Sequence, residues 1–195
     1  MTEHEMKELV VRQRTYFETG ATLPVTLRIT ALRKLYSAIS ANENAIHDAL
    51  KKDLGKSGFE SYMCETGLVL EEISYMLKHI RQFAREKRVH TPLSQFHSRS
   101  FQKPSPYGVV LIMSPWNYPF LLTLSPLADA LAAGNTAIVK PSAYSPYTSA
   151  ILQKILSQCF DPQYVAVVTG GRAENACLLR EHFDYIFFTG SQSVG

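Results

Sequence analysis

The sequence predicts an α/β fold in which N-terminal helices precede a parallel sheet. Three observations predict it. Apolar residues recur at helical spacing over residues 1–87, a polar segment with several prolines follows at 88–107, and short apolar strands alternate with helices over 108–195. Such alternation favours a parallel sheet with right-handed crossovers, whose ligands bind outside the carboxyl ends of the strands. A chain of 195 residues with 46% hydrophobic residues can bury a stable core.

Composition argues against several classes of function. The net charge of +3 is small and the basic residues form no dense stripe, so we expect no nucleic-acid partner. No run of about 18 apolar residues occurs, so no membrane-spanning helix is predicted in this segment. The polar, acidic N-terminus does not resemble a secretory signal. Cys64, Cys159 and Cys177 form no C-x-x-C pair, which predicts neither a metal site nor a disulfide framework and favours a reducing, cytoplasmic compartment.

The first two helices are predicted from periodicity and capping residues. Residues 4–18 are amphipathic, and Gly20 is expected to stop that helix. Thr22 can cap a second helix with Pro24 in its first turn. The apolar positions of this second helix are Leu27, Leu32, Leu35, Tyr36 and Ile39.

Two further helical stretches follow. Asn42 can cap a third helix, which Gly55 ends in left-handed conformation. A fourth, longer stretch is expected to run to about Lys87. Its buried stripe consists of Ile73, Leu77 and Ile80, with Met76 and Phe83 beside it.

The segment 92–107 contains three prolines and is mostly polar, so we expect an extended or hairpin excursion. A strand that reaches away from the core could pair with another subunit. An exposed loop without a partner is the equally supported alternative.

The remainder predicts alternating strands and helices. The strands are expected at Val109–Met113, Ala137–Lys140, Tyr164–Val168 and Tyr185–Phe188, and the helices at about 120–133, 146–158 and 173–181. Gly134 closes the first of these helices, and Ser145-Pro146 opens the second. Pro126 should kink the first helix or mark its start.

Chemistry is expected directly after each strand. Asn117 follows the first strand and could direct its NH₂ group toward a developing oxyanion, although a turn asparagine that bonds its own backbone is the alternative. Lys140 ends the second strand and could donate to ribose or phosphate. An ordinary solvated lysine is the alternative there.

Glycines follow the other two strands. Gly170 and Gly171 permit a sharp bend or close approach to a ligand, and Gly190 with Ser191 offers free N–H groups to a phosphate at a helix start. A simple strand-to-helix turn is the alternative in each case. Neither G-x-G-x-x-G nor the P-loop pattern occurs.

These segments carry a resemblance. Two stretches resemble the aldehyde dehydrogenase superfamily, namely SPWNYPFLLTLSPLADALAAGNTAIVKPSAYSP and VVTGGRAENACLLREHFDYIFFTGSQSVG. Two shorter stretches resemble its class 3 branch, namely GLVLEEISYMLKHI and HFDYIFFTGS. The resemblance covers nearly the whole chain, least clearly residues 1–20. It implies a Rossmann-like domain that binds NAD or NADP, an aldehyde substrate, and a homodimer in the full-length enzyme.

The resemblance also implies individual roles. Asn117 matches the catalytic asparagine that stabilises the tetrahedral oxyanion, and Lys140 matches the lysine that binds the adenosine ribose. Pro115 and Trp116 match residues that shape the nicotinamide entrance. The other implied cofactor-binding residues are Ser142, Gly171, Phe188, Thr189, Gly190, Ser191 and Val194.

One departure from the class 3 pattern concerns cofactor choice. The pattern usually continues K-P-S-E, and its glutamate holds the ribose 2′-hydroxyl, but this chain has Ala143 at that position. A carboxylate would repel a 2′-phosphate and alanine cannot. We therefore expect a weaker preference for NAD and use of NADP.

A larger departure is the absence of the family's G-Q-x-C and L-G-G-K contexts, which hold its nucleophile and general base. The three cysteines are therefore expected to be small buried hydrophobes. Because the chain stops at Gly195, where a helix would begin, we expect a truncated or split chain, or a fragment of a chain about twice as long.

For the complete enzyme the resemblance implies attack of a cysteine thiolate on the aldehyde, hydride transfer to the nicotinamide, and hydrolysis of a thioester by a glutamate-activated water. This chain alone is then expected to be inactive. Two alternatives stay open. One is a nucleotide- or subunit-binding chain without catalysis, and the other is an acylating relative that passes the thioester to coenzyme A.

Overall fold

The computed structural model describes residues 1–192, and residues 193–195 lie outside the described part. Within that part, a four-stranded sheet has the order β5-β4-β3-β6 with every neighbouring pair parallel, which confirms the predicted sheet. Its strands are β3 (Val109–Met113), β4 (Thr136–Lys140), β5 (Val165–Val167) and β6 (Tyr185–Phe188). The chain runs outward from β3 to β5 and then returns to place β6 on the other side of β3, so the strand order reverses at β3.

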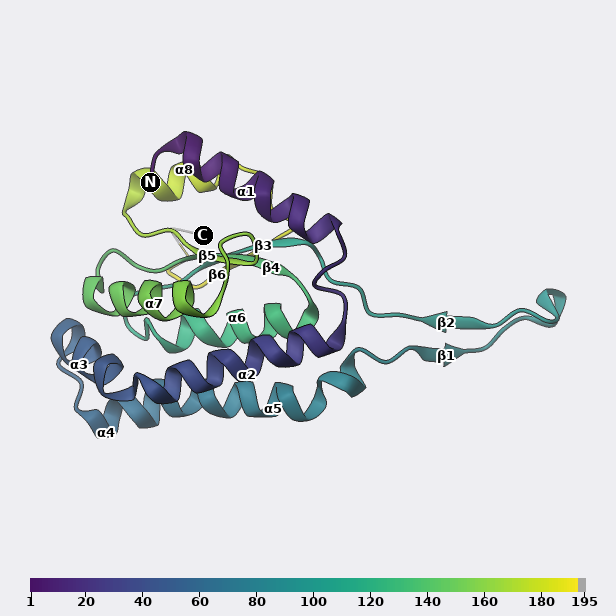
Figure 1. The fold of residues 1–195 in the computed structure, drawn as a ribbon, viewed down its shortest axis with the longest axis horizontal. Coiled ribbons are helices and arrows are strands. Elements are labelled where there is room, and N and C mark those ends of the chain that lie inside the picture. Colours follow the sequence, from purple (N-terminus) through teal and green to yellow (C-terminus); the bar gives the residue numbers. More distant parts are fainter. Residues whose placement is uncertain (193–195) are drawn as a thin grey trace.

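Helices cover both faces of this sheet (Figure 1). The pair α6 and α7 packs on one face, and the pair α1 and α8 packs on the other. Their bounds are α1 (Glu3–Glu18), α6 (Leu121–Ala133), α7 (Pro146–Cys159) and α8 (Arg172–Leu178). The central strands β3 and β4 are buried along their whole length, whereas the side chains of the edge strand β6 are exposed.

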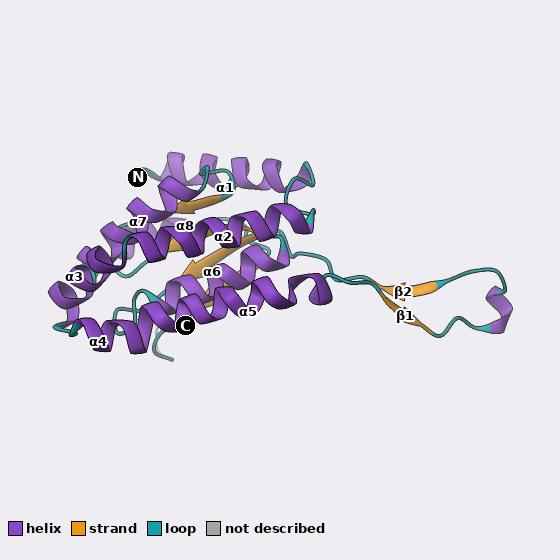
Figure 2. Ribbon diagram, turned by 60° about the horizontal axis from the view of Figure 1, so that its bottom comes forward, coloured by secondary structure: helices purple, strands orange, loops and turns teal. Residues whose placement is uncertain are grey.

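A second helical layer lies outside α6 and α7 (Figure 2). It consists of α2 (Val25–Ala41), α3 (Glu43–Leu54) and α5 (Gly67–Phe83). The predicted apolar positions Leu32, Leu35 and Ile39 are completely buried in this layer. In the predicted stripe of α5, Ile73 and Ile80 are buried and Leu77 is partly buried, so helical periodicity identified the faces that build the core.

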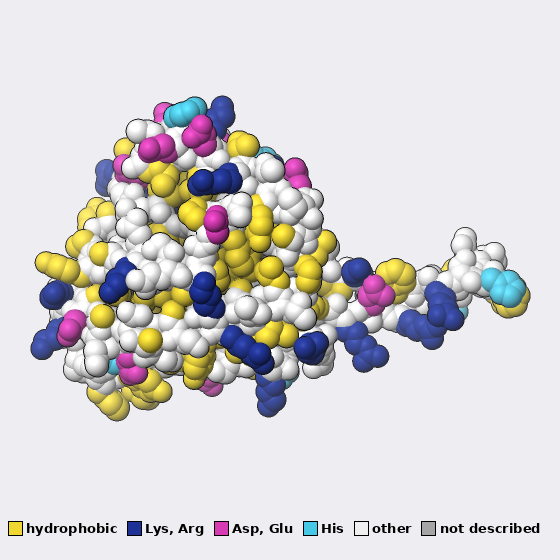
Figure 3. All heavy atoms as spheres, in the orientation of Figure 1, with side chains coloured by type: hydrophobic (Ala, Val, Ile, Leu, Met, Phe, Trp, Pro, Cys, Tyr) yellow, Lys and Arg dark blue, Asp and Glu magenta, His cyan; other side chains and the backbone are white. Residues whose placement is uncertain are grey.

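The segment 84–107 forms an arm that projects from the body (Figures 1 and 2), in agreement with the predicted hairpin. Its strands β1 (Lys87–Val89) and β2 (Ser100–Gln102) pair antiparallel, and a short 3-10 turn, η2 (Leu93–Gln95), lies near the tip. Basic side chains line much of the arm (Figure 3). Because α5 ends at Phe83, the prediction that the helix reaches Lys87 is wrong by about one turn.

One predicted helix cap is wrong, and a second is right in position but makes no capping hydrogen bond. Thr22 does not cap α2, because the helix starts only at Val25 and Pro24 itself occupies the N-cap position. The Thr22 hydroxyl is instead buried without a hydrogen-bond partner in the described part. Asn42 does occupy the N-cap of α3, but its Nδ2 donates to Ala38 O, since the carbonyls at the end of α2 compete for the side chain.

The fourth helical stretch is interrupted by a π-helical turn, which periodicity did not predict. A short helix α4 (Gly58–Ser61) leads into the π turn η1 (Tyr62–Thr66), which continues into α5. The Gly67 N–H donates to Tyr62 O, and a Cβ at Gly67 would lie 2.7 Å from that carbonyl oxygen. Glycine is therefore required where η1 meets α5.

Smaller differences concern Pro126, α8 and the cysteines. Pro126 lies inside α6 and does not mark its start, and α8 ends at Leu178, before the predicted residue 181. Cys159 is buried as expected, but Cys64 and Cys177 are only partly buried. The expectation of three buried cysteines therefore holds for one of them.

Candidate functional site at the strand ends

Backbone hydrogen bonds join the carboxyl ends of neighbouring strands. In the register, Met113 of β3 pairs with both Lys140 of β4 and Phe188 of β6, so these three strands end at the same level. The bonds just beyond them are Ser114 N to Lys140 O (3.3 Å), Thr189 N to Met113 O (3.1 Å) and Val168 N to Val139 O (2.9 Å). The segments that follow the four strands consequently start from one common edge.

A cavity of about 560 Å³ opens at this edge. It is lined by residues 113–117, 140–144, 170–172 and 188–191, together with Leu122 and Asn175. The lining includes each predicted site residue of the described part: Pro115, Trp116, Asn117, Lys140, Ser142, Gly171, Phe188, Thr189, Gly190 and Ser191. Val194, which was also predicted, lies outside the described residues. The volume is typical of a ligand pocket.

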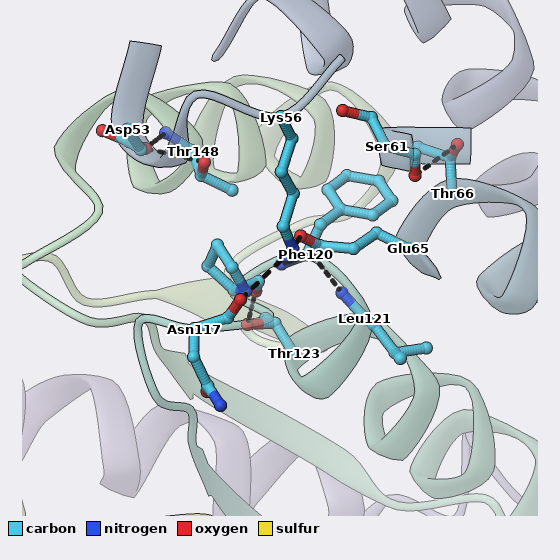
Figure 4. A network of polar contacts seen from close by, with 11 residues as sticks. Asp53, Lys56, Ser61, Glu65, Thr66, Asn117, Phe120, Leu121, Thr123 and Thr148 are labelled. Atoms are coloured by element: carbon cyan, nitrogen blue, oxygen red, sulfur yellow. Dashed lines mark hydrogen bonds and ion pairs between the residues drawn. The ribbon is translucent and has the colours of Figure 1, made fainter. Parts of the chain in front are cut away.

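Asn117 presents its side chain to this cavity. Its backbone carbonyl accepts a hydrogen bond from Lys56 Nζ at 3.2 Å, while its carboxamide points away from that contact (Figure 4). The carboxamide makes no hydrogen bond to any residue of the described part, so the alternative of a turn asparagine that bonds its own backbone is not realised. Its NH₂ group is available to a ligand in the cavity.

The Asn117 loop is held on its other side by Thr123. Thr123 Oγ1 donates to Pro119 O at 2.5 Å and lies 2.6 Å from Ser114 Oγ. Both Ser114 and Thr123 are buried. This contact fastens the end of the loop to its beginning.

Lys140 is buried, so the alternative of an ordinary solvated lysine is not realised. It is only 3% exposed, and its Nζ donates to Gly170 O at 2.7 Å and Pro141 O at 3.0 Å. Burial lowers the pKa of Lys140, and the nearby carboxylate of Glu174 opposes this shift. An ammonium group has three N–H donors, so one remains for a ligand.

Glu174 explains the geometry of the two glycines after β5. Its Oε2 accepts from Gly171 N at 2.6 Å, and hydrogen bonds from the backbone N–H groups of Glu174 and Gly171 lower its pKa. Gly170 has φ +135, and a Cβ there would lie 2.4 Å from the Glu174 carboxyl carbon. A Cβ at Gly171 would meet nothing within 4 Å, so Gly171 faces open space.

Gly190 packs against the ring of Phe188. A Cβ at Gly190 would lie 2.3 Å from the far end of that ring, so a larger residue would displace Phe188 from the cavity wall. The absence of a side chain at Gly190 therefore makes room for the Phe188 ring.

The loop after β4 contributes Ser142 and Ala143. Ser142 Oγ accepts from Tyr144 N at 3.2 Å, and Ser142 O accepts from Ser149 Oγ at 2.8 Å, so α7 fixes this loop. Ala143 is exposed and lines the cavity. Its position offers a ligand no carboxylate.

Sequence reasoning missed three residues that shape the site, namely Glu174, Lys56 and Glu65. Glu174 stands three residues after Gly171 at the start of a helix, and this capping pattern could have identified it. Lys56 and Glu65 gave no such signal, because they come from different segments and resemble ordinary surface charges in the sequence.

A larger hollow of about 860 Å³ lies between α1 and α7 beside β5. Its walls are residues of α1, the end of α7 and the edge strand β5, and it contains none of the predicted site residues. It lies away from the strand ends that carry Asn117 and Lys140. The strand-end cavity is therefore the candidate site.

A parallel sheet with its cavity at the carboxyl ends, next to the strand where the order reverses, is typical of nucleotide-binding α/β proteins. The family model described as "Aldehyde dehydrogenase family" matches residues 1–195. The chain therefore belongs to the aldehyde dehydrogenase family, and the predicted α/β fold with a Rossmann-like sheet is confirmed.

Its relatives include members of aldehyde dehydrogenase family 3. The 4,4′-diaponeurosporen-aldehyde dehydrogenase of Staphylococcus aureus is 42% identical over 182 residues, which cover 93% of this chain and 40% of the relative. Human aldehyde dehydrogenase family 3 member B1 is 42% identical over 184 residues, covering 94% of this chain and 39% of the relative. A substrate-bound structure of Staphylococcus aureus AldH matches with a TM-score of 0.93 at 40% identity, covering 96% of this chain and 41% of that one.

The chain thus spans about 40% of the length of these relatives. Among residues 1–192, no helix is both long and apolar enough to cross a membrane. The same residues contain no cluster of three or more His, Cys, Asp or Glu side chains suited to a metal ion.

Proposed function

We propose that this chain provides the cofactor-binding part of an enzyme that oxidises aldehydes to carboxylic acids with NAD or NADP. The gathering of Asn117, Lys140, Gly171 and Gly190 around the strand-end cavity supports this function. A nicotinamide cofactor supplies the hydride chemistry when bound, and the chain orients it. Membership of the aldehyde dehydrogenase family supports the same reaction.

The residues present fit a dinucleotide. Lys140 keeps a free N–H donor beside the loop after β4, where it would bond ribose hydroxyls. Gly171 leaves open space for the adenine side, and the 188–191 turn would lie at the pyrophosphate. Pro115 and Trp116 would border the nicotinamide. Each of these assignments belongs to the proposal.

Asn117 is proposed as the catalytic residue of this chain. A carboxamide NH₂ can donate to the oxygen of the aldehyde as negative charge develops on it, and an unpaired side chain at the cavity wall suits that task. The nucleophile and general base would have to come from sequence beyond the matched stretch, because the G-Q-x-C and L-G-G-K contexts are absent. The 195-residue chain alone is therefore proposed to be inactive.

A nucleotide-binding chain without catalysis is the second candidate. None of Cys64, Cys159 and Cys177 lines the strand-end cavity, which favours this function for the chain by itself. Assays of aldehyde-dependent NAD(P) reduction, on the chain and on the natural polypeptide that contains it, separate the two. Carboxylate formation by the natural polypeptide supports the dehydrogenase, and release of acyl-coenzyme A supports an acylating enzyme instead.

We also propose that the arm of residues 84–107 contacts a second copy of the chain in a homodimer. The arm is separated from the core and exposes apolar side chains near its tip, including Leu93 and Phe96. An assembled structure in which the arm touches no other chain would rule this out.

Replacing Lys140 tests cofactor binding. Lys140→Met is expected to weaken NAD binding about 10–100-fold, as for the loss of a hydrogen bond from a charged donor. The protonated form of Lys140 is the one that donates to NAD, and burial holds the pKa of this lysine below 10.5. As the pH rises through that pKa, the affinity of the wild-type chain for NAD should therefore fall toward that of the variant. Calorimetric titration across the alkaline range measures both effects.

Lys154→Met, which removes an exposed lysine on α7, is the matched control and should bind NAD like the wild type. Since Lys140 also bonds Pro141 O and Gly170 O, circular dichroism must show that the variant is folded. Equal NAD affinity in Lys140→Met and the wild type would refute the role of this lysine.

Replacing Ala143 tests cofactor choice. Ala143→Glu is expected to weaken NADP binding at least about tenfold, because a carboxylate beside the ribose would repel a 2′-phosphate by more than about 1.4 kcal/mol. NAD binding should be retained. Ala143→Gln has nearly the same size without the charge and is the control. A wild-type chain that binds NAD alone would contradict the premise.

A further inference from the structure

The loop that carries Asn117 is supported from behind by a buried ion pair (Figure 4). Lys56 Nζ lies 2.5 Å from Glu65 Oε1, and neither residue lines the cavity. Lys56 is 7% exposed and Glu65 is completely buried. Burying two charges costs solvation energy, and the attraction between them seldom exceeds this cost by much. A contribution to the stability of the fold is therefore a weak explanation for the presence of this pair.

Lys56 also contacts the loop that carries Asn117. Its Nζ donates to Asn117 O at 3.2 Å and lies 4.1 Å from the centre of the Tyr118 ring, within cation–π distance. The ammonium group thus holds the backbone of the residue whose side chain faces the cavity. Lys56 follows α3 in the chain and is 61 residues away from Asn117.

Glu65 holds the other end of the loop. Its Oε2 accepts from Phe120 N at 2.8 Å and Leu121 N at 3.1 Å, two N–H groups at the start of α6 that have no partner within the helix. A carboxylate at this end of a helix is also favoured by the helix dipole. Glu65 lies in the π turn η1, which ends at Thr66, so this unusual turn is the element that presents the carboxylate to α6.

We propose that Lys56 and Glu65 are positioning residues for Asn117. Together they bond the backbone of Asn117, Phe120 and Leu121, and this backbone fixes the point from which the Asn117 carboxamide, which has no hydrogen bond of its own in the described part, reaches the cavity. The inference rests on the proposed function, in which Asn117 donates to the oxyanion. Neither positioning residue would touch substrate or cofactor.

A spectroscopic test uses Trp116, which is the single tryptophan of the 195 residues and precedes Asn117. Lys56→Met and Glu65→Gln are expected to loosen the loop. Acrylamide should then quench Trp116 fluorescence more strongly than in the wild-type chain. Lys56→Arg, which keeps the charge and donors, should restore most of the protection.

A kinetic test uses the natural polypeptide that contains this chain. Because misplacement by about 1 Å can cost about 10²-fold in rate, Lys56→Met and Glu65→Gln should lower kcat about 10–100-fold. The KM for the cofactor should stay within about twofold, since Lys140 and the glycine turns are untouched. A role in folding alone would not produce this split.

Asp53→Asn is the matched control. Asp53 is also a carboxylate that caps a helix, accepting from Tyr147 N at 3.2 Å and Thr148 N at 2.7 Å at the start of α7. Its loss should lower the melting temperature while leaving Trp116 quenching and kcat as in the wild type.

The outcomes separate this inference from the function on which it rests. If the wild-type polypeptide oxidises no aldehyde, the proposed function fails, and the Trp116 measurement still decides whether the ion pair holds the loop. If Lys56→Met and Glu65→Gln lower only the melting temperature, with quenching and kcat unchanged, the positioning role is overturned. Should Glu65→Gln not fold, Lys56→Met and Lys56→Arg decide the question.

Discussion

Asn117→Ala is expected to lower kcat for aldehyde oxidation by about 10²–10³-fold in the natural polypeptide that contains this chain, as for the loss of one oxyanion donor. The carboxamide lies at the cavity wall without a partner in the described part, so its only proposed task is in the reaction. NAD affinity should be unchanged, because Lys140 and the glycine turns are intact. Steady-state kinetics and a NAD titration measure the two quantities.

Stability provides the control for this variant. Asn117 is exposed and its side chain makes no hydrogen bond within residues 1–192, so Asn117→Ala should change the free energy of unfolding by no more than about 0.5 kcal/mol. Asn44→Ala, at an exposed asparagine of α3, should leave both kcat and stability unchanged. Equal kcat for Asn117→Ala and the wild type would remove Asn117 from the mechanism.

The sheet could be predicted because its strands are short and their surroundings are regular. Buried parallel strands appear as continuous apolar runs, and Val109–Met113 is such a run with both faces covered. Once the strands were placed, parallel pairing required their carboxyl ends to meet, so the residues that follow them could be predicted to share one site. Asn117 and Lys140 were found by position, without a specific nucleotide-binding fingerprint.

What could not be predicted depends on contacts between distant segments. Thr22 has the residue type of a helix cap, but α2 starts three residues later, so tertiary packing decided where the helix begins. The π turn before Gly67 leaves no mark in the apolar periodicity. Lys56 and Glu65 are only nine residues apart, with the short helix α4 between them, but their contacts with the backbone of Asn117 and Phe120 join positions 61 and 55 residues apart in the chain.

Arg28 joins α2 to the end of α6, and its replacement is expected to have the largest effect on stability. The side chain is 8% exposed and its guanidinium donates to Thr22 O at 3.0 Å, Leu23 O at 2.8 Å and Ala132 O at 3.3 Å. Burial lowers its pKa, yet an arginine stays charged, so it also complements the negative end of the α6 dipole.

Arg28→Met should therefore lower the free energy of unfolding by about 3–5 kcal/mol, because three buried or partly buried carbonyls lose their donor. For a chain of this size, that corresponds to a drop of about 6–20 °C in melting temperature. Thermal unfolding followed by circular dichroism measures it. The backbone of Gly134, whose φ is +93, lies against the guanidinium of Arg28. A Cβ at Gly134 would lie 2.6 Å from the central carbon of that guanidinium, so the site has no room for a rearranged donor.

Two comparisons distinguish the three-way contact from a general effect of charge. Arg33→Met removes an exposed arginine from the same helix and should alter stability by no more than about 0.5 kcal/mol. Arg28→Lys keeps the charge but lacks the planar fork that reaches three carbonyls together, so it should recover less than half of the loss. If Arg28→Lys were as stable as the wild type, charge at the end of α6 would be sufficient, and the carbonyl contacts of Thr22 and Leu23 would contribute little.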